Sequence, residues 1–223
     1  MYKDVLILIQ ARMGSTRLPG KVLLSFGSST VIGYLLEELI SAGFDRKQIC
    51  VATSFNSADK NLVSYLNNNG NNCFVGSESN VLSRYQQASK KFDKSIIVRL
   101  TADNPFINPS LIKCCIDSHV KSCAKVTSTR IIDIDGNIAR FLPKGSSVDI
   151  FQKEALLKIN SDECNDFDRE HVIPALFRNN NVNLIDNADL TKCGISLEED
   201  IIGISIDTQS DYARACRVLK SKE

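Results

Sequence analysis

The sequence predicts an α/β fold in which helices cover both faces of a mostly parallel central sheet. Short apolar runs with strand composition alternate with segments whose apolar residues recur every three to four positions. This alternation is typical of parallel strands joined by crossover helices. The chain has 223 residues, of which 43% are hydrophobic, and this is enough to form a buried core. We therefore expect a single domain over residues 1–223.

The first half of the chain alternates regularly between the two kinds of element. Strands are expected at 5–9, 49–53, 73–75, 95–100 and 125–129, and helices at 31–42, 57–68, 81–92 and 109–121. Ligands bind such sheets at the carboxyl ends of the strands. The loop at 10–21 follows the first strand and residues 101–105 follow the fourth, so we expect both to open onto one crevice.

The second half is less regular, and we expect a small hairpin insertion in it. The hairpin would span 131–143 around Asp135 and Gly136, because Asp-Gly is a strong turn signal. The remaining expected elements are strands at 147–151, 182–185 and 202–206, and helices at 153–159, 171–178 and 210–220.

Charge and cysteine content exclude several function classes. The chain has 27 Lys and Arg residues against 26 Asp and Glu residues, a net charge of +1, so we expect no nucleic-acid or membrane partner. The N-terminal apolar run is too short for a signal peptide. The eight cysteines include no CxxC pair. We expect a cytoplasmic protein whose cysteines are reduced and mostly buried, without a disulfide framework.

The stretch 10–21 has the composition of a polyphosphate-binding loop. It contains two glycines, Gly14 and Gly20, and three cations, Arg12, Arg17 and Lys21. Glycines let the backbone approach a ligand closely, and Arg and Lys bind phosphate oxygens. The loop fits neither the Walker A pattern nor the dinucleotide GxGxxG. The composition alone leaves open a solvated basic loop without a ligand.

Two aspartates at expected strand ends are candidate metal ligands. Asp103 lies in LTADNP and Asp207 in SIDTQSD. Each has a simpler alternative, a turn or helix-cap role for Asp103 and the N-cap of the last helix for Asp207. Together with the cationic loop they suit metal-assisted phosphoryl or nucleotidyl transfer. His171 is either a general base or a capping or contact residue.

Seven separated segments then resemble, in the right order, the spore-coat polysaccharide type of cytidylyltransferase. They are ILIQARMGSTRLPGKVL, ICVATS, FVGSESNVLSRY, IIVRLTADNPFINPSLI, GSSVDIF, DFDREHVIPALFR and SIDTQSDYA. The acylneuraminate and 3-deoxy-manno-octulosonate cytidylyltransferases are more distant relatives. The resemblance implies a Rossmann-like nucleotidyltransferase fold, with the hairpin as a dimerisation insertion, and a homodimer. It also implies Mg²⁺-dependent transfer of CMP from CTP to an acidic sugar, with release of pyrophosphate, for surface polysaccharide or glycan biosynthesis.

The same resemblance assigns roles to residues of this chain. Arg12, Lys21 and Asp103 would be catalytic, and Asp103 and Asp207 would bind Mg²⁺. The nucleotide-binding residues would be Ala11, Arg12, Met13, Gly14, Ser15, Arg17, Lys21, Ser77, Arg84, Thr101 and Asp103, with Ser77 and Arg84 near the base or ribose. The acceptor sugar would contact Arg99, Asp149, Arg169, Glu170 and His171.

The chain departs from the family pattern at several positions. Asn80, Ser83 and Ser147 stand where acidic residues are usual, and Asp149 replaces a usual Glu. Two other functions therefore stay open. One is a glycosyltransferase that uses a nucleotide sugar, for which the IDID sequence at 132–135 is poor support because it lies in the expected hairpin. The other is a nucleotide-binding relative without catalytic activity.

Overall fold

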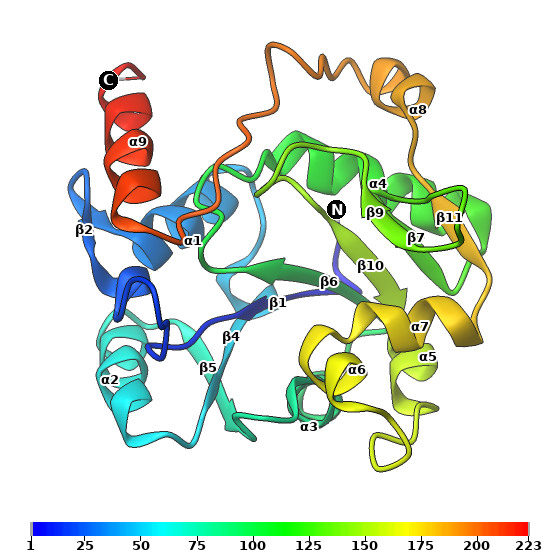
Figure 1. Ribbon diagram of the computed structural model, residues 1–223, viewed down its shortest axis with the longest axis horizontal. Coiled ribbons are helices and arrows are strands. Elements are labelled where there is room, and N and C mark those ends of the chain that lie inside the picture. The colour runs from blue at the N-terminus through cyan, green and yellow to red at the C-terminus, as the bar shows by residue number, and fades with distance from the viewer. Residues whose placement is uncertain (1, 223) are drawn as a thin grey trace.

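The computed structural model describes residues 2–222 and has a seven-stranded central sheet (Figure 1). The strand order is β11-β7-β10-β6-β1-β4-β5. The bounds of these strands, in chain order, are β1 Val5–Gln10, β4 Ile49–Ser54, β5 Asn72–Gly76, β6 Ile96–Thr101, β7 Val126–Ser128, β10 Asp149–Gln152 and β11 Val182–Leu184.

Most neighbouring strands of this sheet are parallel. In the parallel register, Ile7 of β1 is paired with Ile49 of β4 and Val98 of β6. β5 continues the parallel sheet beyond β4. β10 runs antiparallel to both β6 and β7, whereas β11 is parallel to β7. The predicted mostly parallel α/β sheet is thus confirmed, with one antiparallel strand inserted in its second half.

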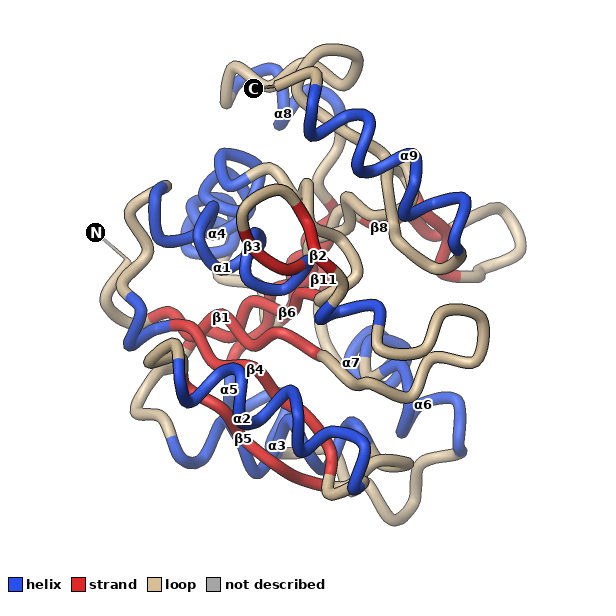
Figure 2. The backbone as a smooth tube through the Cα atoms, turned by 90° about the vertical axis from the view of Figure 1, so that its left-hand side faces the viewer, coloured by secondary structure: helices blue, strands red, loops and turns tan. Residues whose placement is uncertain are grey.

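Helices pack on both faces of the sheet (Figure 2). Their bounds are α1 Val31–Ser41, α2 Lys60–Asn68, α3 Val81–Lys91, α4 Pro109–Ser122, α5 Lys153–Leu157, α6 Asp166–His171, α7 Ile173–Asn179, α8 Asn187–Lys192 and α9 Gln209–Lys220. Alternate residues of β1 face opposite sides. Ile7 and Ile9 share a core with α1, α2 and α4, while Leu6 and Leu8 share another with α3, α5 and α7. Burial on both faces explains why β1 is apolar from Val5 to Ile9.

A third, smaller core holds the last helix beside two short hairpin strands, β2 Ser25–Phe26 and β3 Ser29–Thr30. Phe26 and Phe106 meet edge to face, with ring centroids 5.6 Å apart, and Ala215 and Leu219 of α9 belong to the same cluster. In Figure 1, α9 stands beside β2 at one end of the molecule. A second hairpin, β8 Arg130–Ile132 and β9 Ile138–Arg140, confirms the predicted insertion around Asp135 and Gly136.

Two of the predicted elements differ in the structure. The strand predicted at 202–206 is wrong, because within residues 2–222 this extended segment pairs with no strand. It is held instead by Ile206 N, which donates to Asp103 O at 2.8 Å. The helix predicted at 171–178 is broken, since α6 ends at His171 and α7 begins at Ile173. Val172 between them has φ +65°, a conformation that a β-branched residue rarely adopts.

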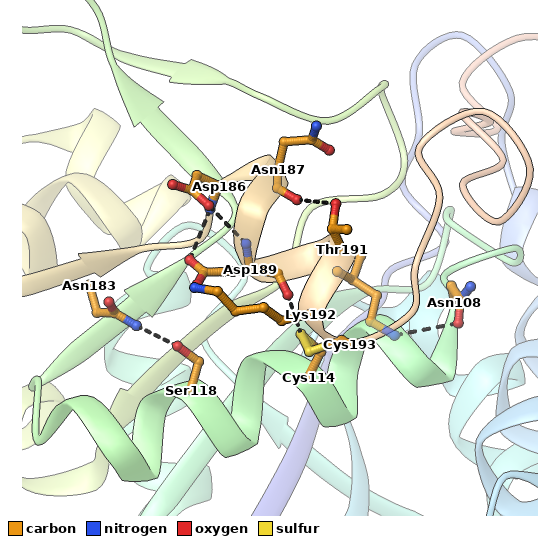
Figure 3. Close-up of a disulfide and its surroundings, with 11 residues drawn as sticks. Asn108, Cys114, Ser118, Asn183, Asp186, Asn187, Asp189, Thr191, Lys192 and Cys193 are labelled. Carbon is orange, nitrogen blue, oxygen red and sulfur yellow. Dashed lines mark hydrogen bonds and ion pairs between the residues drawn. A yellow bond between two sulfur atoms is a disulfide. The ribbon is translucent and has the colours of Figure 1, made fainter.

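The prediction that every cysteine is reduced is also wrong. Cys114 of α4 and Cys193, which follows α8, form a disulfide with Cα atoms 6.0 Å apart (Figure 3). The two positions are 79 residues apart, and α8 itself was not predicted. Their contact depends on how α8 folds back over α4, which no local sequence pattern shows. The other six cysteines are free, and only Cys50 and Cys115 among them are buried, so the expectation that the cysteines are mostly buried is wrong as well.

Among the described residues, no helix has both the length and the apolar character needed to cross a bilayer.

Candidate active site

A pocket of about 520 Å³ opens where β1 and β6 end side by side. Gln10 and Thr101, the last residues of these two paired strands, both line it. The crevice predicted between the loop at 10–21 and residues 101–105 is therefore present. Cationic side chains outnumber carboxylates on its wall. The cations are Arg12, Arg17, Lys21, Arg99, Arg130, Arg140 and Lys144, and the carboxylates are Asp103, Glu170 and Asp207.

A buried carboxylate that the sequence analysis missed fixes the first loop. Asp59 is 1% exposed, and its Oδ1 accepts a hydrogen bond of 2.7 Å from Met13 N. Its Oδ2 accepts from Thr53 Oγ1 at 2.8 Å and from Ser54 N. Burial alone would raise the pKa of Asp59, but these hydrogen bonds outweigh it and lower the pKa. A charged Asp59 therefore anchors the loop from below the pocket.

The loop then turns back on itself and places Lys21 in the pocket. Met13 O accepts hydrogen bonds from both Ser15 N and Gly20 N, each at 2.9 Å. Gly20 has φ +70°, a left-handed conformation that favours glycine, and it precedes the short 3-10 helix Lys21–Leu23. Of the predicted nucleotide-binding residues in this loop, all but Met13 line the pocket. Met13 contributes through its backbone.

Lys21 joins the two predicted metal-binding aspartates. Its Nζ lies 2.7 Å from Asp103 Oδ2 and 2.9 Å from Asp207 Oδ1. Asp207 also pairs with Lys144 and, at 3.4 Å, with Arg17 Nη2. Burial would raise the pKa of Asp207, but the hydrogen bonds from Lys144 and Lys21 overcome it and lower the pKa to about 2. Both carboxylates thus face one cation at the pocket floor.

The alternative role of Asp207, as the N-cap of the last helix, is wrong. The N-cap of α9 is Thr208, whose side chain accepts from Asp211 N in a capping box. Asp207 is consequently free to point into the pocket.

The same two aspartates suit a divalent cation. Asp103 and Asp207 bring hard oxygen ligands together around Lys21, which contacts Asp103 Oδ2 and Asp207 Oδ1 and leaves the second oxygen of each carboxylate for another cation. No cluster of three or more metal-ligating side chains occurs within residues 2–222. This donor set nevertheless fits Mg²⁺, which is usually held by one or two carboxylates and completes its shell with water and substrate phosphates.

On the opposite wall, a buried aspartate braces two arginines. Asp149 is 1% exposed and accepts from Arg130 Nε at 3.0 Å and Nη2 at 3.2 Å, a bidentate pair. Arg99 Nη1 lies 3.5 Å from Asp149 Oδ2, and Arg99 Nη2 donates to Gln10 Oε1 at 3.0 Å. Ser128 Oγ donates to Asp149 as well. Burial opposes ionisation of Asp149, but the two arginines and Ser128 outweigh it and lower its pKa.

This geometry separates the predicted acceptor residues into two groups. Arg99, Glu170 and His171 line the pocket. Asp149 lies behind the arginines and does not line the pocket. Arg169 does not line it either, because its guanidinium donates to Ser161 O and Asp162 O and pairs with Asp166. Asp149 thus braces the two arginines from behind, whereas the Arg169 side chain is attached to the segment 161–166.

His171 closes one side of the pocket at the end of α6. Its ring packs edge to face on Phe167, with centroids 4.4 Å apart. Burial lowers its pKa, the nearby Glu170 opposes this, and Arg99 and Arg130 lower it further. The neutral imidazole is therefore favoured near pH 7, the form in which a histidine can accept a proton.

The structure does not bring Ser77 and Arg84 to the pocket wall. Arg84 is 1% exposed, and its Nη1 donates to Ser77 O at 2.7 Å. Burial lowers the pKa of Arg84. This contact fixes the loop that precedes α3.

Three further cations on the wall were missed by the sequence analysis, Arg130, Arg140 and Lys144. Arg130 and Arg140 are cross-strand partners at the base of the β8–β9 hairpin. Lys144 lies in the loop between this hairpin and β10. The hairpin itself was predicted at 131–143, so the one available signal was that Arg130 and Lys144 flank it and Arg140 lies within it.

Comparison with known proteins agrees with this geometry. A sequence profile of the cytidylyltransferase family matches residues 6–222. The spore coat polysaccharide biosynthesis protein SpsF of Bacillus subtilis (strain 168) is 34% identical over 178 residues, which cover 78% of this chain and 73% of that protein. A cytidylyltransferase structure from Leptospira borgpetersenii serovar Hardjo-bovis (strain JB197) superposes with a TM-score of 0.79 at 28% identity, covering 98% of this chain and 94% of the other.

A more distant structure shares the fold. A CMP:2-keto-3-deoxy-manno-octonic acid synthetase complexed with CTP superposes with a TM-score of 0.71 at 16% identity, covering 99% of this chain and all of the other. The match of the family profile to nearly the whole chain, with SpsF as a relative, shows that the protein belongs to the cytidylyltransferase family.

Proposed function

We propose that this enzyme transfers CMP from CTP to an acidic sugar and releases pyrophosphate, with Mg²⁺ as cofactor. The observation that carries the proposal is the pair of carboxylates, Asp103 and Asp207, that meet at Lys21 on the floor of a basic pocket. Nucleotidyl transfer needs this combination of cations for the phosphates and carboxylates for a metal. The similarity to SpsF supports a role in surface polysaccharide biosynthesis.

The loop cations have defined tasks in such a transfer. A hydroxyl oxygen of the sugar attacks the α-phosphorus of CTP, and the bond from that phosphorus to the bridging oxygen of pyrophosphate breaks. Negative charge grows on the α-phosphoryl group and on the leaving pyrophosphate. Arg12, Arg17 and Lys21 stabilise this charge, and Ala11, Gly14, Ser15 and Thr101 shape the wall around the triphosphate. His171, favoured in its neutral form, is placed to take the proton of the hydroxyl.

Mg²⁺ would be held by Asp103 and Asp207. When bound, it neutralises phosphate charge as a Lewis acid. Lys21 keeps the two carboxylates close to one another before the metal arrives.

An acidic acceptor is supported by the arginines braced on Asp149. Arg99 and Arg130 carry two positive charges against the one negative charge of Asp149, so this wall keeps a net attraction for an anion. Guanidinium groups bind carboxylates in paired hydrogen bonds. Glu170, which lies 4.0 Å from Arg12, would contact sugar hydroxyls between the two halves.

We also propose that the enzyme is a homodimer that pairs through the β8–β9 hairpin. Ile131, Ile132 and Ile134 are 39%, 51% and 102% exposed there, an unusual concentration of exposed apolar side chains on one short segment.

The test is a thermal-shift panel of CTP, UTP, GTP and ATP, each with and without Mg²⁺. A ligand that binds the folded state raises the melting temperature by mass action. We expect a selective shift with CTP that Mg²⁺ strengthens, followed by pyrophosphate release when acidic sugars are added. A larger shift with a sugar nucleotide, with nucleoside diphosphate as product, would favour a glycosyltransferase. CTP binding without turnover on any acidic sugar would favour a non-catalytic relative.

The structure offers the glycosyltransferase alternative little support. The carboxylate of Asp133 in the IDID sequence accepts from Asp135 N and Asn137 N within the hairpin turn, and neither aspartate lines the pocket. This is the turn role predicted for them.

A further inference from the structure

The two oxygens of Asp207 are held by different cations. Oδ1 accepts from Lys21, which is 11% exposed and shared with Asp103. Oδ2 pairs with Lys144 and with Arg17, which are 50% and 62% exposed. The inner cation is thus fixed between two carboxylates, while the outer cations hold Asp207 from the side of the solvent.

Close backbone packing delivers Lys144 to this position. A Cβ atom on Gly145 would lie 2.4 Å from Ile204 O, and Gly145 has φ +99°, so only glycine fits there. A Cβ atom on Gly203 would lie 2.4 Å from the Cβ of Pro143. The loop that carries Lys144 is consequently pressed against the segment that leads to Asp207.

A side-chain hydrogen bond secures the same contact. Ser146 Oγ donates to Ile202 O at 3.2 Å, so residues on both sides of Lys144 are attached to the 202–205 segment. The lysine backbone is fixed, and only its flexible side chain is free to move.

Lys21 contacts only Oδ1 of Asp207, so Oδ2 is the oxygen on which a divalent cation would meet Lys144. On that oxygen the metal and the Lys144 ammonium would repel each other at contact distance and cannot coexist. Lys21 is enclosed between Asp103 and Asp207, whereas half of the Lys144 side chain is exposed and has room to turn away. Of the two outer cations on Oδ2, Lys144 lies closer than Arg17, whose Nη2 is 3.4 Å away, so Lys144 is the side chain that must leave. The triphosphate that we propose to bind in this pocket is the anion it would then meet.

Resting on the proposed use of Mg²⁺, we infer that Lys144 competes with the divalent cation for Asp207 and moves to the leaving pyrophosphate once metal and CTP are bound. Lys144 then serves the reaction in two states. Without ligand it neutralises Asp207, and with ligand it stabilises the charge that develops on the leaving group. In the absence of the metal, the Lys144 ammonium thus occupies the position at Asp207 that the metal would take.

Substitution of Lys144 should strengthen Mn²⁺ binding and at the same time slow turnover. Lys144→Met removes the competitor, so Mn²⁺ used as a spectroscopic probe should bind the nucleotide-free enzyme about two- to fivefold more tightly, the equivalent of an exposed ion pair. The same substitution should lower turnover roughly ten- to hundredfold, because a charged hydrogen bond to pyrophosphate is lost. The Mn²⁺ affinity is read by electron paramagnetic resonance and calorimetry, and turnover by pyrophosphate release.

Two further variants separate this role from a structural one. Lys144→Arg keeps a cation beside Asp207 and should not bind Mn²⁺ more tightly than the wild type. Lys192→Met removes an exposed lysine that pairs with Asp189 at 3.3 Å on α8, and it should change neither quantity. Circular dichroism and the melting temperature establish that each variant is folded, and Lys144→Gln replaces Lys144→Met should that variant fail to fold.

The outcomes distinguish this inference from the proposed function. Tighter Mn²⁺ binding together with slower turnover supports it. Equal or weaker Mn²⁺ binding by Lys144→Met, with binding by the wild type intact, overturns the inference and leaves the proposed function standing. No Mn²⁺ binding by either protein, with or without CTP, overturns the metal role in the proposed function and the inference with it.

Discussion

Two walls of the pocket carry arginines, and they hold them in different ways. On the loop wall, Arg12 and Arg17 are 45% and 62% exposed and make ion pairs of 4.0 and 3.4 Å. On the hairpin wall, Arg99 and Arg130 are 10% and 21% exposed, and both pair with Asp149, which is 1% exposed. The loop arginines are loosely held, whereas the hairpin arginines are fixed.

The difference matches the two kinds of anion that the enzyme is proposed to bind. A triphosphate has many oxygens and several rotatable bonds, so cations that adjust their position suit it. A single carboxylate is planar, and recognising one acid among others requires guanidinium groups already in place. Burying charged groups costs desolvation free energy, which the attraction between the partners offsets. Removing one partner therefore leaves an uncompensated charge in the interior and destabilises the fold.

The largest expected effect comes from breaking the fixed wall. Asp149→Ala leaves Arg99 and Arg130 without their shared carboxylate, and we expect the free energy of unfolding to fall by about 3–5 kcal/mol. Urea denaturation measures it. Arg17→Ala on the loose wall is the matched control and should change stability by less than about 0.5 kcal/mol. Equal effects of the two substitutions would contradict the distinction between the walls.

The second effect concerns Lys21, which lies on the loop wall but is buried like the hairpin arginines. Lys21→Met should lower kcat by about 10²- to 10³-fold, the usual loss for one preorganised charge at a reacting centre. The KM for CTP should rise by less, because Arg12 and Arg17, which we propose to bind the phosphates, remain. Steady-state pyrophosphate release measures both constants, and unchanged kinetics would rule out the catalytic role of Lys21.

The third effect probes a buried histidine behind the hairpin wall. His119 is 1% exposed, and its ring contacts Thr127 Oγ1 at 2.9 Å and the Gln152 amide at 3.0 Å. Burial, with a smaller effect of Lys125, lowers its pKa from 6.5 to about 4. Since the unfolded chain binds this proton first, its contribution to stability is complete above pH 6.5 and is lost as the pH falls toward 4. The change amounts to about 3 kcal/mol at 1.36 kcal/mol per pKa unit.

This pH effect can be isolated by difference. Denaturation midpoints of the wild type and His119→Gln are compared at pH 7 and pH 4.5, and the wild type should lose more stability than the variant. His171→Gln is the control because it removes the other histidine, and it should retain most of the wild-type slope. A slope in His119→Gln as steep as that of the wild type would contradict the assignment.

The sequence predicted the loop wall far better than the hairpin wall. Lys21 meets Asp103 and Asp207, which are 82 and 186 residues away in the sequence. The sequence could predict that Lys21 and Asp103 share a crevice, because each follows a predicted strand of a parallel sheet. The strand predicted before Asp207 was wrong, but the extended segment still ends at the pocket. The family resemblance predicted that these residues form one site, and their charges are those that nucleotidyl transfer requires.

The hairpin wall depends on contacts that leave no local pattern. Arg130 reaches the pocket from the base of a hairpin and Lys144 through close packing at Gly145, so only the folded chain brings them there. Asp149 was predicted to touch the acceptor because its position matches the family motif. Side chains alternate between the two faces of a strand, and this alternation places Asp149 behind the arginines. A shift of one residue in the strand register would have turned the Asp149 side chain to the other face.

The smallest expected effect on stability lies at the tip of the hairpin whose base forms the fixed wall. Ile134 is fully exposed, so at concentrations where the chain is monomeric Ile134→Ser should leave the melting temperature unchanged, as should Val120→Ser, a control at a residue 59% exposed on α4. If the tip is the dimer contact, Ile134→Ser alone should shift the mass seen by light scattering from dimer toward monomer.

The same variant tests whether the dimer supports the fixed wall. Arg130 and Arg140 lie opposite each other on the two strands at the base of this hairpin, so a loosened tip should weaken binding of the acid acceptor while CTP binding persists. A wild-type protein that is monomeric at all concentrations would contradict the proposed dimer. A monomeric variant with unchanged acceptor affinity would show instead that Asp149 alone fixes this wall.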